Sequence, residues 1–246
     1  MFLISPEYYK IEKFKKRGRG VVALKDIPAG TVIGDYLGRL VDGDEAEKLE
    51  RLDFAGDCYS LHYWGDLSVF PVDVKGVGVH LINNSCSNNC STYFYCGHSL
   101  IFNVRKILAG EELTLDYLFD VENKEGYIHA CHCGSPICRG TMYAPEEKLK
   151  AYGAFCSKLI EKYKFKKQKH GEVLLPLDNY PKLIKDDAYF DLYSNFEAKP
   201  ELAREVVLPT IKELRRRLCL SGRPLTFTKL KYTVLGICDG LIIGRK

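Results

Sequence analysis

The sequence contains no long hydrophobic run. Its apolar stretches fall short of the ~20 residues that a membrane-spanning helix needs. Residues 1–13 also lack a basic stretch followed by a sustained apolar one, so we expect no cleaved signal peptide. Tryptophan occurs once and methionine twice, yet apolar residues make up 46% of the chain. With 246 residues, this composition predicts one large globular domain, or a catalytic domain with a smaller companion.

Histidine is scarce and cysteine is not. The six histidines are scattered, and no two stand four residues apart, the spacing that places two imidazoles on one helix face. Ten cysteines are many for a chain without a secretion signal. Thiols in a reducing compartment do not persist as disulfides, so the count favours metal binding over a disulfide framework.

Charge is unevenly distributed along the chain. Residues 1–144 carry 15 Lys and Arg against 19 Asp and Glu, a net charge of −4, whereas residues 145–246 carry 21 against 13, a net charge of +8. An acidic region suits a cationic substrate and a basic region suits a polyanion. Two differently solvated surfaces would explain the same asymmetry without any partner.

Short strands and frequent turns are expected up to residue 143, and helices after it. Apolar runs between turn signals predict one acidic helix and a series of strands: helix 42–53, and strands within 21–24, 31–38, 58–74 (around Gly65 and Asp66), 91–96, 99–108 and 113–119. Helical periodicity begins at Pro145, and a second helix is expected over 200–220 with a kink at Pro209. Residues 225–243 fit either a third helix or two strands. The boundary falls near residue 144.

A tight group of cysteines is the strongest local signal. Cys131, Cys133 and Cys138 lie within eight residues and present three thiolates to one point. A structural zinc ion needs four tetrahedral ligands, so a fourth must come from elsewhere. On spacing alone the fourth ligand stays open among four residues: Cys86, Cys90, His129 and His132.

Two further segments gain meaning only together with this loop. Residues 81–90 place polar residues and cysteines after an apolar pair, and residues 110–117 lead from a Gly-Glu-Glu turn into a strand that ends at Tyr117. Taken singly, the first would build Asx-turns and the tyrosine would pack in a core.

In order, these segments resemble a SET domain followed by a post-SET zinc loop, over roughly residues 15–143. Five stretches carry the resemblance: Arg17-Gly18-Arg19-Gly20, Gly34-Asp35-Tyr36-Leu37-Gly38, Gly76 through Cys90, Gly110 through Tyr117, and Cys131 through Gly140. The resemblance implies a mainly β SET fold, with small twisted sheets and a pseudoknot, and helical periodicity predicts an α-helical C-terminal domain after it. The predicted divisions are a SET domain over 1–127, a post-SET zinc loop over 128–144 and a helical basic domain over 145–246.

The resemblance also implies an activity, protein-lysine methylation with S-adenosylmethionine, and a role for each matching residue. Tyr117 and Tyr36 are the expected catalytic pair, and Leu115 and Phe119 line the substrate channel. The cofactor would be bound by six residues: Arg17, Gly18, Arg19, Tyr59, Asn83 and Asn84. Structural zinc would be held by four cysteines: Cys86, Cys131, Cys133 and Cys138.

The sequence departs from the family pattern at several of these positions. Asn84 stands where the family usually has His, and Leu115 stands where it has Phe or Tyr. Tyr at this place hydrogen-bonds a water beside the amine and favours monomethyl product in the family. Leu is smaller and has no hydroxyl, so we expect di- or trimethylation.

The expected substrate is a lysine-rich protein, first of all a histone tail or nucleosome. DNA contact is expected through basic stretches of the C-terminal region, residues 162–169 and 215–217. Two alternatives stay open, a methyltransferase for a non-histone protein and a catalytically silent zinc-stapled binding module. The expected location is intracellular and nuclear, with delivery into a host nucleus as an effector as a further alternative.

Overall fold

The computed structural model describes residues 1–53, 59–119, 130–135, 138–165 and 168–185. Contacts divide the chain into two compact units. Unit 1 comprises Met1–Asn83, Cys90–Leu113 and Ala154–Ile184, and unit 2 comprises Asn84–Asn89, Thr114–Gly153 and Lys185–Lys246. The predicted helix over 200–220 and the segment 225–243 lie outside the described residues.

Three small sheets carry the fold, as expected for a mainly β chain. The first has the order β1-β2-β10-β7, the second β3-β9-β8 and the third β4-β6-β5. The strand bounds are β1 Tyr9–Phe14, β2 Gly18–Ala23, β3 Val32–Asp35, β4 Arg39–Asp42, β5 Leu61–Trp64, β6 Leu67–Phe70, β7 Asn83–Asn84, β8 Cys90–Tyr95, β9 His98–Asn103 and β10 Glu112–Leu115. Two short 3₁₀ turns complete this part, η1 Pro6–Tyr8 and η2 Val79–Leu81. The pairs within unit 1 whose register is defined are antiparallel.

The core of unit 1 lies around β9. All six residues of this strand are buried, and its centre, Leu100 to Phe102, is apolar, whereas His98, Ser99 and Asn103 are buried polar residues. The predicted turn at Gly65 is present between β5 and β6, with φ +59. Strands β1 and β4 were not predicted, because charged residues interrupt the apolar pattern in both.

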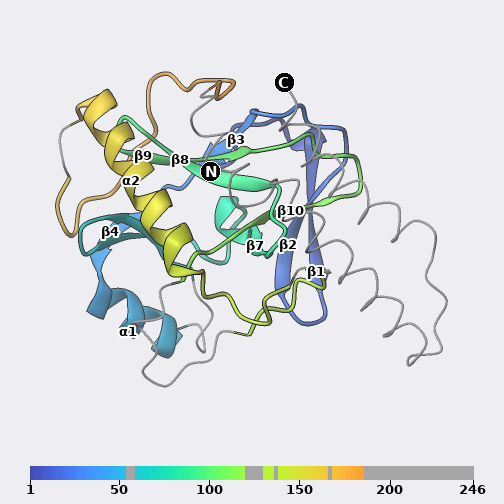
Figure 1. Cartoon of the computed structure of the whole chain (residues 1–246), viewed down its shortest axis with the longest axis horizontal. Helices are drawn as coiled ribbons and strands as arrows, with labels where there is room; N and C mark the ends of the chain where they lie inside the picture. The colour runs from blue at the N-terminus through green and yellow to red at the C-terminus, as the bar shows by residue number, and fades with distance from the viewer. Residues whose placement is uncertain (54–58, 120–129, 136–137, 166–167, 186–246) are drawn as a thin grey trace. The chain divides into compact units, whose positions relative to one another are not determined.

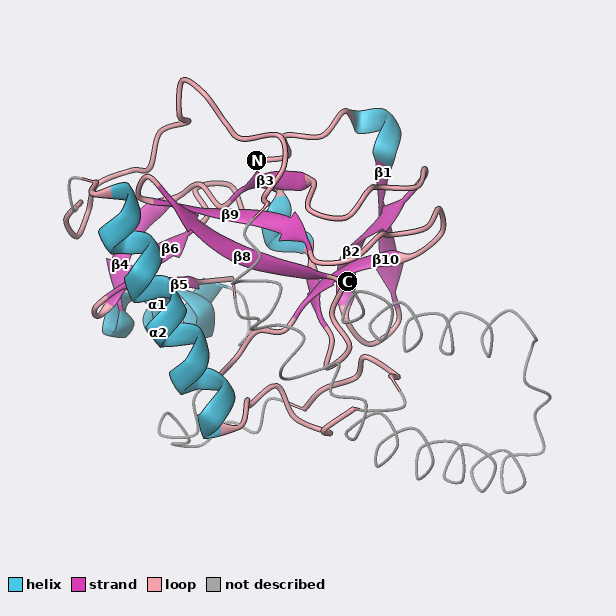
Figure 2. Ribbon diagram, turned by 45° about the horizontal axis from the view of Figure 1, so that its top comes forward, coloured by secondary structure: helices cyan, strands magenta, loops and turns pink. Residues whose placement is uncertain are grey.

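Helix α1, Gly43–Asp53, confirms the predicted acidic helix. Asp42 caps it, since its Oδ1 accepts the Glu45 N–H at 2.8 Å. Ala46 and Leu49 pack against Phe70, so the helix covers the third sheet (Figures 1 and 2).

Helix α2, Glu146–Tyr163, begins where the sequence predicts a helix. Its second half belongs to unit 1, where Phe155 and Tyr163 pack their rings against Tyr93 of β8. Residues 154–184 therefore join the unit formed by the N-terminal strands. The separate basic domain over 145–246 stays a prediction, since residues 186–246 lie outside the described part. No helix among the described residues is both long and apolar enough to cross a membrane.

Candidate functional site

In unit 1, Tyr36 lies just beyond the end of β3 and is buried. Its hydroxyl donates to the backbone carbonyl of Tyr59 at 2.6 Å, which joins two residues that the sequence assigns to the site. Because a phenol has one proton, a hydroxyl that donates it to a carbonyl can offer a further ligand only its oxygen as an acceptor. The geometry thus defines Tyr36 as an acceptor towards a ligand N–H.

The predicted cofactor segment lies where the turn after β1 leads into β2, with Arg17 at the end of the turn and Gly18 and Arg19 at the start of the strand. Gly18 has φ +68, which favours glycine, and a Cβ there would meet nothing within 4 Å. The Arg17 guanidinium pairs with Glu112 at 2.7 Å, and Asn83 Nδ2 donates to the Arg19 carbonyl at 3.1 Å and to Glu112 at 3.0 Å. The structure therefore brings four of the predicted cofactor residues together, with open space beside the Gly18 backbone.

Arg19 has a second task in unit 1 that the sequence did not reveal. Its guanidinium donates to the carbonyls of Val74 and Lys75, both at 2.6 Å, and to that of Gly76 at 3.1 Å. The side chain thereby fixes the loop before η2, and the backbone of residue 19 remains the part that could face a cofactor.

In unit 2, Tyr117 stands in a constrained loop. Its backbone N–H donates to Asn84 Oδ1 at 2.9 Å, and the next residue, Leu118, has φ +54. A left-handed leucine costs of order 1–3 kcal/mol and persists only where its surroundings enforce it. Asn84 and Asp116 supply that enforcement, because Asp116 Oδ1 accepts the Leu118 N–H at 3.4 Å.

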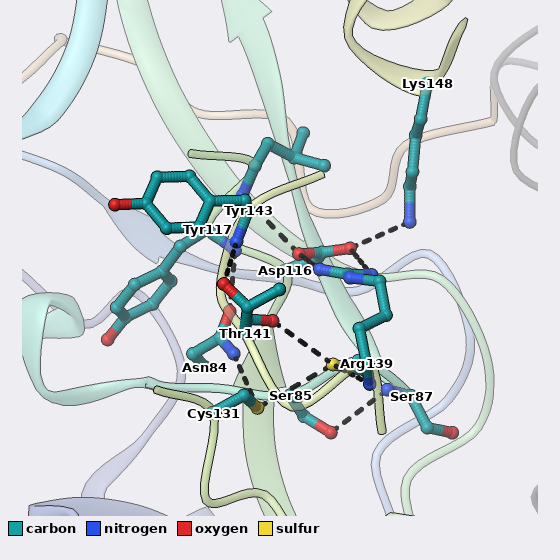
Figure 3. Close-up of polar contacts among 12 residues, drawn as sticks. Asn84, Ser85, Ser87, Asp116, Tyr117, Cys131, Arg139, Thr141, Tyr143 and Lys148 are labelled. Carbon is teal, nitrogen blue, oxygen red and sulfur yellow. Dashed lines mark hydrogen bonds and ion pairs between the residues drawn. The ribbon is translucent and has the colours of Figure 1, made fainter. Parts of the chain in front are cut away.

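The predicted channel residues flank this loop in unit 2. Leu115 is buried at the end of β10, and its carbonyl accepts the Ser85 N–H at 2.7 Å. Phe119 stacks its ring at a tilt against Tyr117, with centroids 5.7 Å apart, and edge-on against Tyr143 at 6.4 Å. Figure 3 shows the rings of Tyr117 and Tyr143 extending to the side away from the Asp116 ion pairs.

The four predicted metal ligands meet in unit 2. The sulfur atoms of Cys86, Cys131, Cys133 and Cys138 all lie within 4.8 Å of one another. Four thiolates about 2.3 Å from one zinc ion would stand about 3.8 Å apart in a tetrahedron, and the Cys86 and Cys131 sulfurs are 3.7 Å apart. Soft sulfur donors in this arrangement fit zinc. Of the ligands left open by spacing, Cys86 joins the loop, Cys90 and His132 are not part of this group, and His129 lies outside the described residues.

Polar N–H groups surround the sulfurs. Asn84 Nδ2 donates to Cys131 at 3.2 Å, the Arg139 backbone N–H to Cys86 at 3.4 Å, and the Gly140 N–H to Cys138 at 3.4 Å. Such outer donors stabilise thiolates and fix their orientation. Between the sulfurs, a hydrogen bond from Cys86 lowers the pKa of Cys133 to about 4, and the same bond raises the pKa of Cys86. The thiolate form is therefore favoured at Cys133, whereas the pKa values of Cys86 and Cys138 are raised.

A buried carboxylate beside Tyr117 ties this loop to the cysteines. Asp116 accepts two hydrogen bonds from the Arg139 guanidinium, at 2.7 and 2.9 Å, and one from Lys148 of α2 at 2.9 Å (Figure 3). Burial alone would raise the pKa of Asp116, but the two cations outweigh it and the pKa lies below its ordinary value. Sequence reasoning missed this network, although Arg139 lies within the Cys-Arg-Gly stretch.

Asn84 and Arg139 therefore each join the cysteine cluster to the Tyr117 loop. Asn84 bonds Cys131 through its amide nitrogen and Tyr117 through its amide oxygen. Arg139 bonds Cys86 through its backbone and Asp116 through its side chain. A change at the sulfurs is thus transmitted to the loop by two direct contacts.

Comparisons with known proteins match about half of the chain. Residues 18–118 match the family model of the SET domain. The chain is 35% identical over 139 residues to histone-lysine N-methyltransferase trithorax of Drosophila virilis, and 34% identical over 141 residues to histone-lysine N-methyltransferase 2B of Homo sapiens. These matches cover 54% and 55% of this chain, but only 4% and 5% of the two relatives.

A solved structure was also found, described as the crystal structure of KRYPTONITE in complex with mCHG DNA and SAH. It shares 21% identity with the chain at a TM-score of 0.46, and the match covers 55% of this chain and 29% of that one.

Proposed function

We propose, from the premise that residues 18–118 are a SET domain, that this chain methylates the side-chain amine of lysine in a protein substrate. S-adenosylmethionine would be the methyl donor and a histone tail the first candidate substrate. The observation that carries the proposal is the fixed position of Tyr117, whose backbone N–H is held by Asn84 inside the segment that matches the family. The relatives, named as histone-lysine methyltransferases, support the same reaction.

Methyl transfer to an amine is an in-line displacement that depends mainly on positioning. When bound, S-adenosylmethionine would supply the methyl group on its sulfonium, and residues of the chain would hold the neutral lysine amine in line with it. Tyr36 suits the task of orienting the amine, because its oxygen can accept an amine N–H while its own proton goes to Tyr59. Tyr117 is proposed to line the lysine channel together with Phe119 and Leu115.

The cofactor is proposed to lie against residues 17–19 and the Asn83–Asn84 pair, with Tyr59 as a further contact. The fit rests on the open space beside Gly18, which leaves the backbone accessible. Zinc is proposed to be held by Cys86, Cys131, Cys133 and Cys138. Four protein ligands would close its coordination, so the metal is structural and takes no part in the transfer.

Two partner proposals follow from charge. The net charge of −4 over residues 1–144 favours a lysine-rich peptide, whereas the basic residues after 144 favour contact with nucleosomal DNA. Exposed Lys164 and Lys169 belong to that basic stretch. A histone substrate places the proposed site of action in the nucleus.

The decisive experiment combines one substitution with labelled cofactor. Tyr117→Phe removes one hydroxyl and is expected to lower the methylation rate of histones about 100-fold or more, while cofactor binding measured by calorimetry changes little. Tyr9→Phe is the matched control, because Tyr9 stacks on Phe2 at 4.0 Å and has no proposed contact with substrate. Cofactor binding without transfer to any histone or nucleosome would instead identify a silent binding module, and transfer only to other proteins would identify a non-histone enzyme.

The degree of methylation is a finer proposal that rests on Leu115. Leucine leaves more room beside the amine than an aromatic residue, so di- or trimethyl-lysine is the expected product. Leu115→Tyr is expected to shift the product towards monomethyl-lysine in mass spectra. A wild-type protein that stops at monomethyl-lysine with excess cofactor would contradict this proposal.

A further inference from the structure

A segment after the SET match forms backbone hydrogen bonds with residues that precede and residues that follow Tyr36 in the sequence. We define residues 171–184 as the strap; all of it lies in unit 1. Towards its start it bonds Gly38 and Leu40, and towards its end it bonds Gly30 and Val32; Figure 1 draws this segment in orange. Five backbone hydrogen bonds join it there: Gly171 N–H to Leu40 O, Leu40 N–H to Glu172 O, Leu174 N–H to Gly38 O, Val32 N–H to Lys182 O and Ile184 N–H to Gly30 O, at 2.8–3.0 Å.

The strap is packed against unit 1 and is not a loosely lying tail. Leu174 is 2% exposed and Ile184 is 6% exposed, so each end has an apolar anchor. Fully burying one such side chain contributes about 1.5–3 kcal/mol. Isolated antiparallel bridges, Arg39 with Val173 and Thr31 with Leu183, lie beside these anchors. Because both ends are anchored, Tyr180 in the middle of the strap lies beside Asp35, the residue before Tyr36.

At that place a side chain of the strap reaches a buried charge. The Tyr180 hydroxyl donates to Asp35 Oδ2 at 2.8 Å and accepts the Leu177 N–H at 2.9 Å. His98 Nδ1 lies 2.7 Å from the same carboxylate oxygen, and Asp35 is 0% exposed. A buried carboxylate is costly without hydrogen-bond partners. Burial and the bond to Asp35 also raise the pKa of Tyr180, so its hydroxyl remains a proton donor.

Asp35 is the residue immediately before Tyr36. Successive side chains of an extended chain point to opposite faces, so Asp35 is held from the face opposite Tyr36. The Tyr36 N–H donates to Ser99 O at 3.1 Å, next to His98, and the Leu37 N–H donates to Asp35 O at 3.1 Å. The carboxylate and its partners therefore fix the direction in which the Tyr36 hydroxyl meets the Tyr59 carbonyl.

We infer that Asp35, His98 and Tyr180 are positioning residues for Tyr36, and that the strap is a working part of the catalytic unit although it lies outside the SET match. The kinetic consequences of this inference rest on the proposed function, whereas its structural consequences do not. It assigns a role in the site to residues far beyond position 118.

The test uses Tyr180→Phe in the full chain, with Tyr163→Phe as the matched control. Tyr163 is also a tyrosine of the C-terminal segment whose hydroxyl bonds into unit 1, since it lies 3.1 Å from the Tyr93 hydroxyl. Amide hydrogen exchange followed by mass spectrometry needs no activity. In Tyr180→Phe, peptides covering residues 30–40 are expected to exchange about tenfold faster, whereas in Tyr163→Phe they keep the wild-type rate. Unchanged exchange in Tyr180→Phe would overturn the inference.

Kinetics then separate positioning from general stability. Tyr180→Phe is expected to lower kcat about fivefold to tenfold with little change in KM for a histone peptide, since only the orientation of the amine is affected. In a Tyr36→Phe background the same change is expected to lower kcat less than twofold, because the two residues act as one unit. Equal losses in both backgrounds would refute positioning through Tyr36. If Tyr180→Phe speeds exchange in residues 30–40 but the wild type transfers no methyl group, the coupling through the strap stands and the proposed function alone is refuted.

Discussion

Different interactions stabilise the inside of each of the two units of this chain. The largest fully buried side chains, among them Phe102, Ile101, Leu100 and Tyr93, all belong to unit 1. Within the described residues of unit 2, the buried apolar positions are few: Cys86, Leu115, Cys131 and Ala144. Besides the ring contacts of Phe119, its described contacts include sulfur–sulfur approaches, the ion pairs of Asp116 and the amide bonds of Asn84.

This difference predicts that unit 1 is stable without a ligand, whereas the described part of unit 2 depends on one. Apolar burial stabilises unit 1 without any ligand, because each buried large side chain contributes of order 1.5–3 kcal/mol. Four adjacent thiols contribute little until a metal removes their protons and binds them. We therefore expect unit 1 to be ordered with or without zinc, and the order of the described part of unit 2 to depend on zinc.

Metal removal is the largest expected effect. Treatment with a strong zinc chelator is expected to abolish methylation and to release the protection of amides in residues 84–89, 114–119 and 138–144 against hydrogen exchange. Amides of β9 are expected to keep their protection, because this strand is paired with β3 and β8 of unit 1. Mass spectrometry of exchanged peptides measures both regions in one sample. Simultaneous loss of protection in β9 would show that the units are not separate in stability.

The second effect concerns the buried carboxylate. Asp116→Asn removes the charge that pairs with Arg139 and Lys148, and hydrogen bonds of charged groups are worth about 1.5–3 kcal/mol. Since both cations keep some access to water, we expect the free energy of local opening in unit 2 to fall by about 1–3 kcal/mol, measured by hydrogen exchange. The methylation rate should also fall, because Tyr117 directly follows Asp116 in the same loop.

A matched substitution in unit 1 controls for the loss of an ion pair as such. Glu111 accepts from both guanidinium nitrogens of Arg105, at 3.1 and 3.2 Å, and the two side chains are mostly buried. Glu111→Gln is expected to destabilise unit 1 while zinc content and the exchange of residues 114–119 stay unchanged. If both substitutions loosen the Tyr117 loop equally, the Asp116 network is not specific to it.

How far the sequence predicts this molecule depends on how local each cause is. The turn at Gly65 and helix α1 were predicted, because their signals lie within a few residues. The three clustered cysteines were predicted from spacing, whereas the fourth partner stayed open until the family resemblance selected Cys86. Distances in sequence explain this, since 45 residues separate Cys86 from Cys131.

Other features had no local signal at all. Strand β1 mixes charged and apolar residues, and pairing with β2 makes it a strand. Tyr180 and Asp35 are 145 residues apart, and only the packed strap brings them together. Such contacts between residues far apart in the sequence form only in the tertiary structure. Composition and periodicity do not indicate which two distant residues will meet.

The smallest expected effect tests the link between the sulfurs and Tyr117 through one atom. Asn84→Asp keeps the oxygen that accepts the Tyr117 N–H, but places a carboxylate oxygen where the amide nitrogen donates to Cys131. Repulsion between the carboxylate and the thiolate is expected to weaken zinc binding by about 10–100-fold, the usual range for an outer partner of a metal ligand. The fold should persist, because the change removes one N–H···S bond and leaves the backbone bond in place.

Asn103→Asp in unit 1 is the matched control for this last substitution. Asn103 is as buried as Asn84, but its amide nitrogen donates to the carbonyls of Ile27, Pro28 and Arg105, and not to a sulfur. Its loss is expected to cost unit 1 about 1–3 kcal/mol without changing the rate at which zinc passes to a coloured chelator. Faster zinc release in Asn84→Asp alone would establish that the amide serves the metal. Equal release rates in both variants and the wild type would mean that Asn84 holds Tyr117 but does not stabilise the thiolate.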